Sequence, residues 1–251
     1  MWKRRVLLGL LLLFAVLLGG PLMAVAIGRV DVSGNWATAS RDSAGIAPDP
    51  AATPEAVVQV YGARAFGWRG AFAVHTWVAI KPAGAAVFTT HQVIGWRFFR
   101  GGSPVVSRQG APDRHWFGAR PQIYRDLRGA EAEALIARIE AAVRSYPFKG
   151  AYRTWPGPNS NTFTAWIARQ VPELRLELPP TAVGKDYLGP TSFAAASPSG
   201  TGIQVSLLGV FGGLAAWDEG LELHLLGLTL GLDPLDLRLK VPGLGRLPSP
   251  D

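Results

Sequence analysis

The most constraining feature of this chain is an uncharged segment close to its beginning. Lys3, Arg4 and Arg5 precede a run from Val6 to Gly28 that holds no charged residue. As a helix at about 1.5 Å per residue, this run would reach about 34 Å, enough to cross a hydrocarbon core of about 30 Å. Because positive residues precede the run and few charges follow it, we expect a cytoplasmic N-terminus. The body is then expected on the periplasmic or extracytoplasmic side of the cytoplasmic (inner) membrane.

Two interpretations of the apolar segment stay open. In the first, Val6 to Leu18 is the apolar part of a signal peptide, Gly19-Gly20-Pro21 breaks it, and Ala24-Val25-Ala26 is the cleavage site. In the second, residues 6–28 are retained as a membrane anchor and make the membrane a partner of the chain. Both interpretations predict an exported body.

Composition excludes several classes of function. The chain has 251 residues, of which 48% are hydrophobic, so it is long enough for a proper core. The net charge is +7, and the three basic residues before the apolar run account for part of it, leaving +4. Without a basic helix or stripe, nucleic acid is not an expected partner. The absence of cysteine excludes thiol catalysis, disulfides and thiolate metal sites.

Shifts in composition predict four regions. Residues 1–28 form the anchor or signal segment, and residues 29–53, rich in Ser, Ala, Asp and Pro, form a spacer. An α+β core domain follows over residues 54–195. Residues 196–251 form a Gly- and Leu-rich C-terminal β region.

Within the core, the patterns predict an antiparallel sheet packed on two or three helices. Strands are expected over residues 55–61, 71–81 and 86–96, with a loop region over 100–124, and helices over 129–146 and 161–170. In the second strand, alternation places His75 and Trp77 on the same face.

The C-terminal region is expected to be rich in β-hairpins. Residues 203–217 are uncharged but too few to span a membrane as a helix. Leucines alternate with polar residues over 221–225 and again over 235–241, and the Asp233-Pro234 turn predicts a hairpin between them.

The stretch from Tyr152 to Ile167 is the best candidate for a site. The turn Trp155-Pro156-Gly157-Pro158 is rigid, and it leads to Asn159, Ser160 or Asn161 as the cap of a helix. A polar side chain at a helix N-terminus lies in positive potential, where a nucleophile or an anion is stabilised.

Segment 159–163, Asn-Ser-Asn-Thr-Phe, resembles the Asn-Cys-Asn-x-Phe segment of circularly permuted papain-like (NlpC-type) peptidases. The resemblance implies that Ser160 stands at the Cys position and His75 at the position of the strand histidine. His91, on the neighbouring predicted strand, is expected to orient His75, with Asp113 and His115 of the loop region as alternatives. Serine would need a well-aligned base, because it must lose its proton as it attacks.

Other residues complete the set of candidates. Four histidines without ligand spacing predict no metal site, and no cofactor is expected. The candidate catalytic residues are Ser160, His75 and His91, and the candidate binding residues are Trp77, Asp113, His115, Trp116, Trp155, Asn159 and Asn161.

More closely, the chain resembles an uncharacterised bacterial family, domain of unknown function 3750. The segments that carry this resemblance are 69–77, 116–121, 155–163, 182–187 and 197–202, and it extends from about residue 35 to the end. It brings no activity with it.

Three functions follow as hypotheses. The chain is expected to be a binding or scaffold module for an envelope ligand, on a papain-like frame without the thiol. Alternatively, it is a Ser/His-dependent hydrolase or acyltransferase of amide or ester bonds in envelope material. The third hypothesis is a structural envelope protein that contacts lipid through its C-terminal region.

Overall fold

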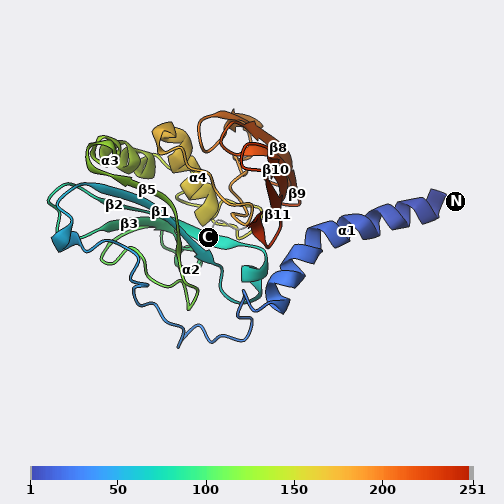
Figure 1. Ribbon diagram of the computed structural model, residues 1–251, viewed down its shortest axis with the longest axis horizontal. Helices are drawn as coiled ribbons and strands as arrows, with labels where there is room; N and C mark the ends of the chain where they lie inside the picture. Colours follow the sequence, from blue (N-terminus) through green and yellow to red (C-terminus); the bar gives the residue numbers. More distant parts are fainter. Residues whose placement is uncertain (1, 249–251) are drawn as a thin grey trace.

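The computed structural model describes residues 2–248, so residue 1 and residues 249–251 of the expected terminal regions lie outside the described residues. A long helix, α1 (Trp2–Ala26), projects from a body built around two antiparallel sheets (Figure 1).

The first sheet has five strands in the order β4-β3-β2-β1-β5. Its strands are β1 (Val57–Arg64), β2 (Val74–Lys81), β3 (Thr89–Val93), β4 (Val105–Gln109) and β5 (Gln122–Arg128). Every residue of β2 is buried, including the polar His75, Thr76 and Lys81.

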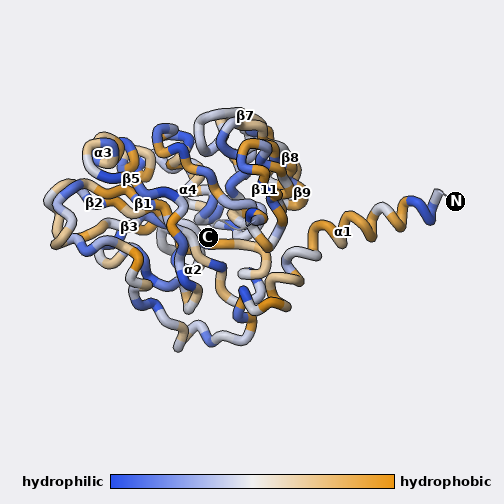
Figure 2. The backbone as a smooth tube through the Cα atoms, viewed as in Figure 1, coloured by the Kyte–Doolittle hydropathy of each residue, from blue (hydrophilic) through white to orange (hydrophobic). Residues whose placement is uncertain are grey.

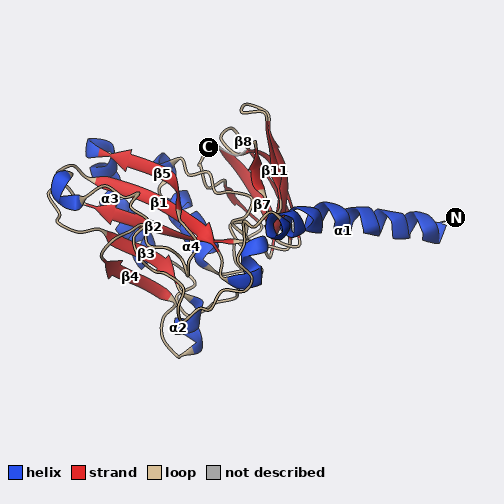
Figure 3. Cartoon of the chain, turned by 60° about the horizontal axis from the view of Figure 1, so that its bottom comes forward, coloured by secondary structure: helices blue, strands red, loops and turns tan. Residues whose placement is uncertain are grey.

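Two helices cover one face of this sheet, α3 (Gly129–Arg144) and α4 (Ser160–Gln170) (Figure 3). In α3 the buried residues recur at helical spacing, and Leu135 and Ile139 meet Val58, Val60 and Val78 of the sheet in the main core. The expected α+β class, with an antiparallel sheet packed on helices, is confirmed.

The opposite face of the first sheet has its own small core. Val57, Tyr61, Trp77, Ala79 and Phe88 pack there, joined by Ile46, Trp116, Ala119 and Ile123. The segment 43–47, expected to be part of a spacer, therefore packs against the body, because Ile46 belongs to this core and Ser43 bridges to Arg114.

The C-terminal region is a seven-stranded meander in which each strand pairs with the next. Its strands are β6 (Ala194–Ala196), β7 (Gly202–Leu207), β8 (Phe211–Ala216), β9 (Gly220–Leu225), β10 (Leu228–Asp233), β11 (Arg238–Val241) and β12 (Gly245–Leu247). The predicted β-rich C-terminal region is confirmed.

Several predicted boundaries were wrong. The strand expected from residue 71 begins at Val74, because a 3₁₀ helix (Gly67–Ala71) precedes it, and the strand expected over 86–96 divides into β3 and the short helix α2 (Gly95–Phe99). The loop over 100–124 contains β4 and the start of β5. The hairpin between 221–225 and 235–241 does not form, because β10 lies between β9 and β11. Two further 3₁₀ turns are Pro50–Ala52 and Pro172–Leu174.

Helix α1 is long and apolar enough to cross a membrane, by its length and composition (Figure 2). Its last turns pack on the body, where Leu17, Gly20, Pro21 and Ala24 are buried. A Cβ at Gly20 would collide with the main chain of Pro242, so the helix touches the turn between β11 and β12.

Candidate functional site

The start of α4 is fixed by a capping box centred on Asn159. The Asn159 Oδ1 accepts from the main-chain N–H of Asn161 at 2.9 Å and of Thr162 at 3.2 Å, and the Thr162 hydroxyl accepts from the Asn159 N–H at 3.1 Å. Of the three residues considered as the N-cap of this helix, Asn159 is therefore the one that takes that position. Before it, Gly157 has φ 136°, and a Cβ at this position would collide with Thr162 and Tyr187, so only glycine fits.

The amides of Asn159 and Asn161 hold neighbouring segments together. The Asn159 Nδ2 donates to the carbonyl oxygens of Thr154 and Val183, both at 3.0 Å. The Asn161 Nδ2 donates to Val74 O at 3.0 Å and to Val183 O at 2.8 Å. Both side chains are buried and already bonded, so in this structure they join α4 to β2 and to residues near 183.

Ser160 and His75 lie on opposite faces of the first sheet. The strand residue facing α4 is Thr76, whose hydroxyl oxygen is 3.3 Å from Ser160 O and 2.9 Å from the Thr164 hydroxyl. Alternation along β2 turns His75 to the other face, with Trp77. Among the described residues, no hydrogen bond joins His75 to Ser160.

His91 does not complete a triad with His75. It pairs with Val78 in the ladder and so shares the α3 and α4 face, where its Nδ1 lies 2.8 Å from the Ser107 hydroxyl. Burial lowers the pKa of His91, partly offset by Glu140 of α3. The three candidate catalytic residues are thus divided between two faces.

His75 belongs instead to an aromatic stack. Its ring lies flat on Trp116, with centroids 3.5 Å apart, and Trp96 stacks on Trp116 at 5.7 Å. Its Nε2 lies 3.0 Å from Gln92 Oε1, so the neutral ring donates there. Burial lowers the pKa of His75 to about 4, which keeps the ring neutral at pH 7.

A cavity of about 240 Å³ opens beside this stack, and we call it the Trp116 pocket. Its walls come from β2, β3, β4, α2 and the loops near residues 41 and 111–117. It is lined by Arg41, Trp77, Thr90, Gln92, Ile94, Trp96, Arg108, Gln109, Ala111, Pro112, Arg114, His115, Trp116 and Phe117.

The lining combines aromatic rings with cations and contains no carboxylate. Three guanidinium groups contribute, from Arg41, Arg108 and Arg114, and none of them makes an ion pair within residues 2–248. Arg41 lies 4.3 Å above the Phe117 ring. Positive potential beside ring faces suits an anion that carries a planar group.

Three of the expected binding residues line this pocket: Trp77, His115 and Trp116. Asp113 lies behind it, where it accepts from the Ser43 hydroxyl and the Ile46 N–H, both at 2.7 Å. Burial would raise the pKa of Asp113, but these bonds lower it. The carboxylate therefore anchors segment 43–47 and leaves the lining free of negative charge.

Trp155, by contrast, lies away from the pocket. Its Nε1 donates to Leu226 O at 2.9 Å, which ties the loop before α4 to the turn between β9 and β10. The sequence reasoning missed Arg41, Trp96, Arg108, Arg114 and Phe117. The available signal was a concentration of aromatic and arginine residues in 96–117.

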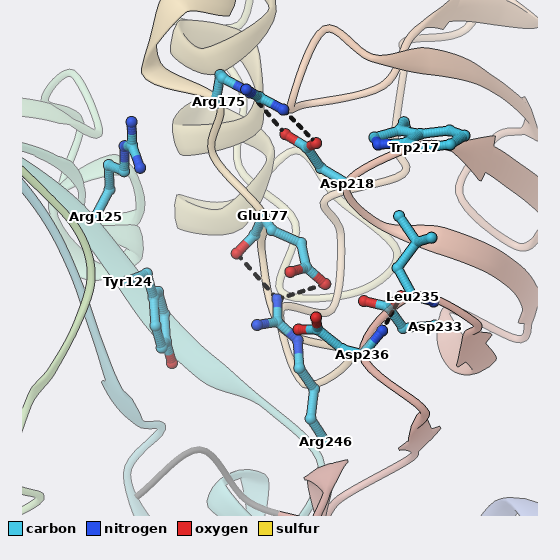
Figure 4. A pocket seen from close by; sticks show the side chains of 10 residues that line it. All are labelled: Tyr124, Arg125, Arg175, Glu177, Trp217, Asp218, Asp233, Leu235, Asp236 and Arg246. Atoms are coloured by element: carbon cyan, nitrogen blue, oxygen red, sulfur yellow. Dashed lines mark hydrogen bonds and ion pairs between the residues drawn. The ribbon is translucent and has the colours of Figure 1, made fainter.

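A larger cavity, about 350 Å³, lies between the first sheet and the C-terminal sheet (Figure 4). Two ion pairs line it, Arg175 with Asp218 at 2.6 Å and Arg246 with Glu177 at 2.7 Å. Both pairs join the segment after α4 to the C-terminal sheet, so they make this cavity a polar joint.

Buried charges strengthen the same joint. Glu222 of β9 is 2.7 Å from the Lys185 Nζ and 2.6 Å from the Lys240 Nζ, and all three side chains are almost inaccessible. Burial alone would raise the pKa of Glu222, but the two lysines lower it to about 2. Within residues 2–248, no His, Asp and Glu side chains are grouped as a metal site.

Comparison with known protein families gives a match. A family model described as "Protein of unknown function (DUF3750)" matches residues 55–187, just over half of the chain. None of the curated proteins and none of the solved structures matches. The matched region contains the first sheet, α3, α4 and most of the Trp116 pocket, and it ends before the C-terminal sheet.

Proposed function

The chain belongs to the DUF3750 family of proteins of unknown function, and we propose that it is an extracytoplasmic binding module. Its ligand is a small anion with a planar or ring-shaped part, drawn from the cell envelope. The binding site is the Trp116 pocket. The cytoplasmic membrane holds the module through α1.

The observation that carries this proposal is the lining of the pocket. Aromatic faces from Trp96, Trp116 and Phe117 supply apolar contact of defined orientation. The Arg108 guanidinium makes no hydrogen bond or ion pair among the described residues, so its forked donors are free to match carboxylate or phosphate oxygens. Arg41 already donates to the carbonyl oxygens of Ala39 and Trp36 and contributes mainly its charge. With no carboxylate in the lining, the three positive charges favour an anionic ligand over a cation.

We further propose that the frame is a papain-like one that has lost its catalytic arrangement. The order of a strand histidine, His75, before a helix that begins at Ser160 supports this. The separation of the two residues by the sheet gives the hydrolase hypothesis less support. Ser160 has no base within hydrogen-bond reach among the described residues to take its proton.

The packing of α1 supports a retained anchor over a cleaved signal peptide. A segment destined for removal needs no fitted contact with the mature body, yet Gly20 and Pro21 fit closely against Pro242 and Gly243. We therefore propose that the body remains attached to the membrane on its extracytoplasmic side.

Calorimetric titration with phenyl phosphate tests the binding proposal, and benzyl alcohol serves as the neutral ligand with the same ring. We expect phenyl phosphate to bind and benzyl alcohol to bind at least tenfold more weakly. Arg108→Gln should weaken phenyl phosphate binding about tenfold, for a loss of about 1.4 kcal/mol. Arg144→Gln, on the exposed side of α3, is the matched control and should leave it unchanged.

Equal affinity for the two ligands would contradict the proposal, because the arginines would then have no role. An equal effect of Arg108→Gln and Arg144→Gln would contradict it too, since binding would then reflect net charge alone.

A further inference from the structure

The C-terminal sheet turns its apolar face outward. The registers of β7 to β11 place Ile203, Val205, Leu221, Leu223, Leu232 and Leu239 on one face, and each of these side chains is exposed. Every other position of that face along β7–β11 holds Ala, Gly, Val, Leu or Phe. A face of this kind on a soluble monomer would be unusually large and uniform.

The inward face has the opposite character. Gln204, Glu222, His224, Thr229 and Lys240 point toward the body and are buried. An antiparallel sheet with one face in water normally buries its apolar residues and exposes its polar ones. The reversal is stable only if something apolar covers the outer face.

We infer that this outer face lies on the lipid of the same membrane that α1 crosses. The sheet stands on the side of the body from which α1 projects, in both views of the chain (Figures 1 and 3). The two elements are also joined, because Gly20 and Pro21 of α1 pack on Pro242 and Gly243 after β11. A membrane crossed by α1 therefore meets this edge of the body.

The position of that contact along α1 indicates how deep the turn after β11 lies in the membrane. A hydrocarbon core of about 30 Å takes about 20 residues of helix, which from Val6 reaches Val25. Gly20 precedes Val25 by about 8 Å at about 1.5 Å per residue. The turn after β11 thus lies at the depth of about 5–10 Å to which interfacial apolar surfaces enter the boundary between headgroups and acyl chains.

Exposed residues in neighbouring turns agree with this placement. Because the sheet is an antiparallel meander, the turns between β7 and β8 and between β9 and β10 lie at the same end of the strands as the turn after β11. Leu208 and Leu226, one in each of these two turns, are exposed. The surface that meets lipid then includes these two turns in addition to the strand face.

The absence of cysteine allows a direct test on the full chain in lipid vesicles. A nitrobenzoxadiazole label is placed on Val205→Cys, Leu223→Cys or Leu239→Cys. Val87→Cys, an exposed apolar position between β2 and β3, is the matched control, and Leu11→Cys marks the middle of α1. Quenching is compared between lipids that carry a nitroxide near the headgroup and iodide in the water.

The three sheet positions should be quenched by the shallow lipid nitroxide several-fold more strongly than position 87, and should be shielded from iodide. Quenching of the sheet labels by iodide as at position 87 would overturn the inference. Shielding from both quenchers would overturn it as well and would indicate a protein cover, such as a second copy.

The inference rests on α1 as a retained anchor. Leu11→Cys is probed with a lipid that carries its nitroxide deep in the acyl chain. If that lipid does not quench the label, the anchor proposal fails, and the inference fails with it. Ligand binding at the Trp116 pocket is measured separately and would not be affected by that outcome.

Discussion

The hydroxyl oxygen of Thr76 lies 3.3 Å from the main-chain oxygen of Ser160. Here β2 contacts the start of α4 through the Thr76 hydroxyl and the Val74 carbonyl oxygen, both bonded to the Asn161 side chain, rather than through a histidine. His75, which precedes Thr76 in β2, points to the opposite face of the sheet, where its ring stacks on Trp116. The first sheet is thus divided into a face that packs on α3 and α4 and a face that carries the aromatic stack beside the Trp116 pocket.

Asn159 and Ser160 should differ sharply when each is changed to alanine. Asn159→Ala removes the cap and two donated bonds, so it should lower the free energy of unfolding by about 2 kcal/mol or more. Ser160→Ala should change it by less than about 0.5 kcal/mol, because no side-chain bond of Ser160 is lost. Urea unfolding measures both. Equal losses would mean that the Ser160 hydroxyl has a role that the hydrogen bonds do not explain.

Ser160 should not react with a serine-directed fluorophosphonate. Its hydroxyl has no aligned base, because His75 faces the other side of the sheet. Labelling should therefore be absent, or equal in the native chain and in Ser160→Ala. Labelling that Ser160→Ala abolishes would restore the hydrolase hypothesis.

Asp186→Asn should stabilise the protein at pH 7. Burial raises the pKa of Asp186 to about 6, partly offset by its main-chain bond, Lys185 and Arg169, and its Oδ2 has no hydrogen-bond partner among the described residues. A raised folded-state pKa gives stability that is present below about pH 4 and is lost as the pH rises through about 6. The variant should thus be more stable by about 2–3 kcal/mol at pH 7 and should match the native chain near pH 4. If the two proteins differed in free energy of unfolding by the same amount at pH 4 and at pH 7, the raised pKa of Asp186 would be contradicted.

His75→Phe should make the free energy of unfolding less sensitive to acid than it is in the native chain. Because burial lowers the pKa of His75 to about 4, its contribution is present above about pH 6.5 and is lost as the pH falls toward 4. Phenylalanine keeps a ring on Trp116 but does not titrate. The native chain should therefore lose about 3 kcal/mol more than the variant between pH 7 and pH 4. Parallel stability curves in urea titrations would show that the ring does not titrate in this way.

Glu222→Ala should loosen the C-terminal sheet. The change leaves Lys185 and Lys240 as buried charges with fewer partners, and the loss of one partner of a buried pair costs about 3–5 kcal/mol. The matched control is Glu131→Ala, whose pair with Arg125 is 4.0 Å apart and partly exposed. The control should cost less than about 1 kcal/mol.

Limited proteolysis gives the readout for the Glu222 and Glu131 variants. Cleavage between residues 188 and 193 should become faster in Glu222→Ala and should stay unchanged in Glu131→Ala. Similar cleavage of the two variants would mean that the buried charges do not hold the sheet in place.

Much of the fold followed from local patterns. The repeat of buried apolar residues in α3 is local, since residues three and four apart share a face, so the helix was predicted from residue 129 onward and confirmed. Alternation likewise placed Trp77 with His75 correctly. The strand expected over 86–96 was wrong at its end, where α2 begins at Gly95 and Gly95 packs closely against Tyr152, a contact across more than fifty residues.

For this protein, the sequence by itself determined the apolar helix, the antiparallel α+β class, the lack of thiol chemistry and the family. These depend on composition and on short periodic patterns, which tertiary contacts rarely reverse. Only the tertiary structure decided which polar residues meet. The register of β2 against α4 put Ser160 and His75 on different faces, and the pairing of β7–β11 turned leucines outward and Glu222 inward. Such choices depend on contacts between residues far apart in the chain, and a strand pattern is the same whichever face the rest of the molecule covers.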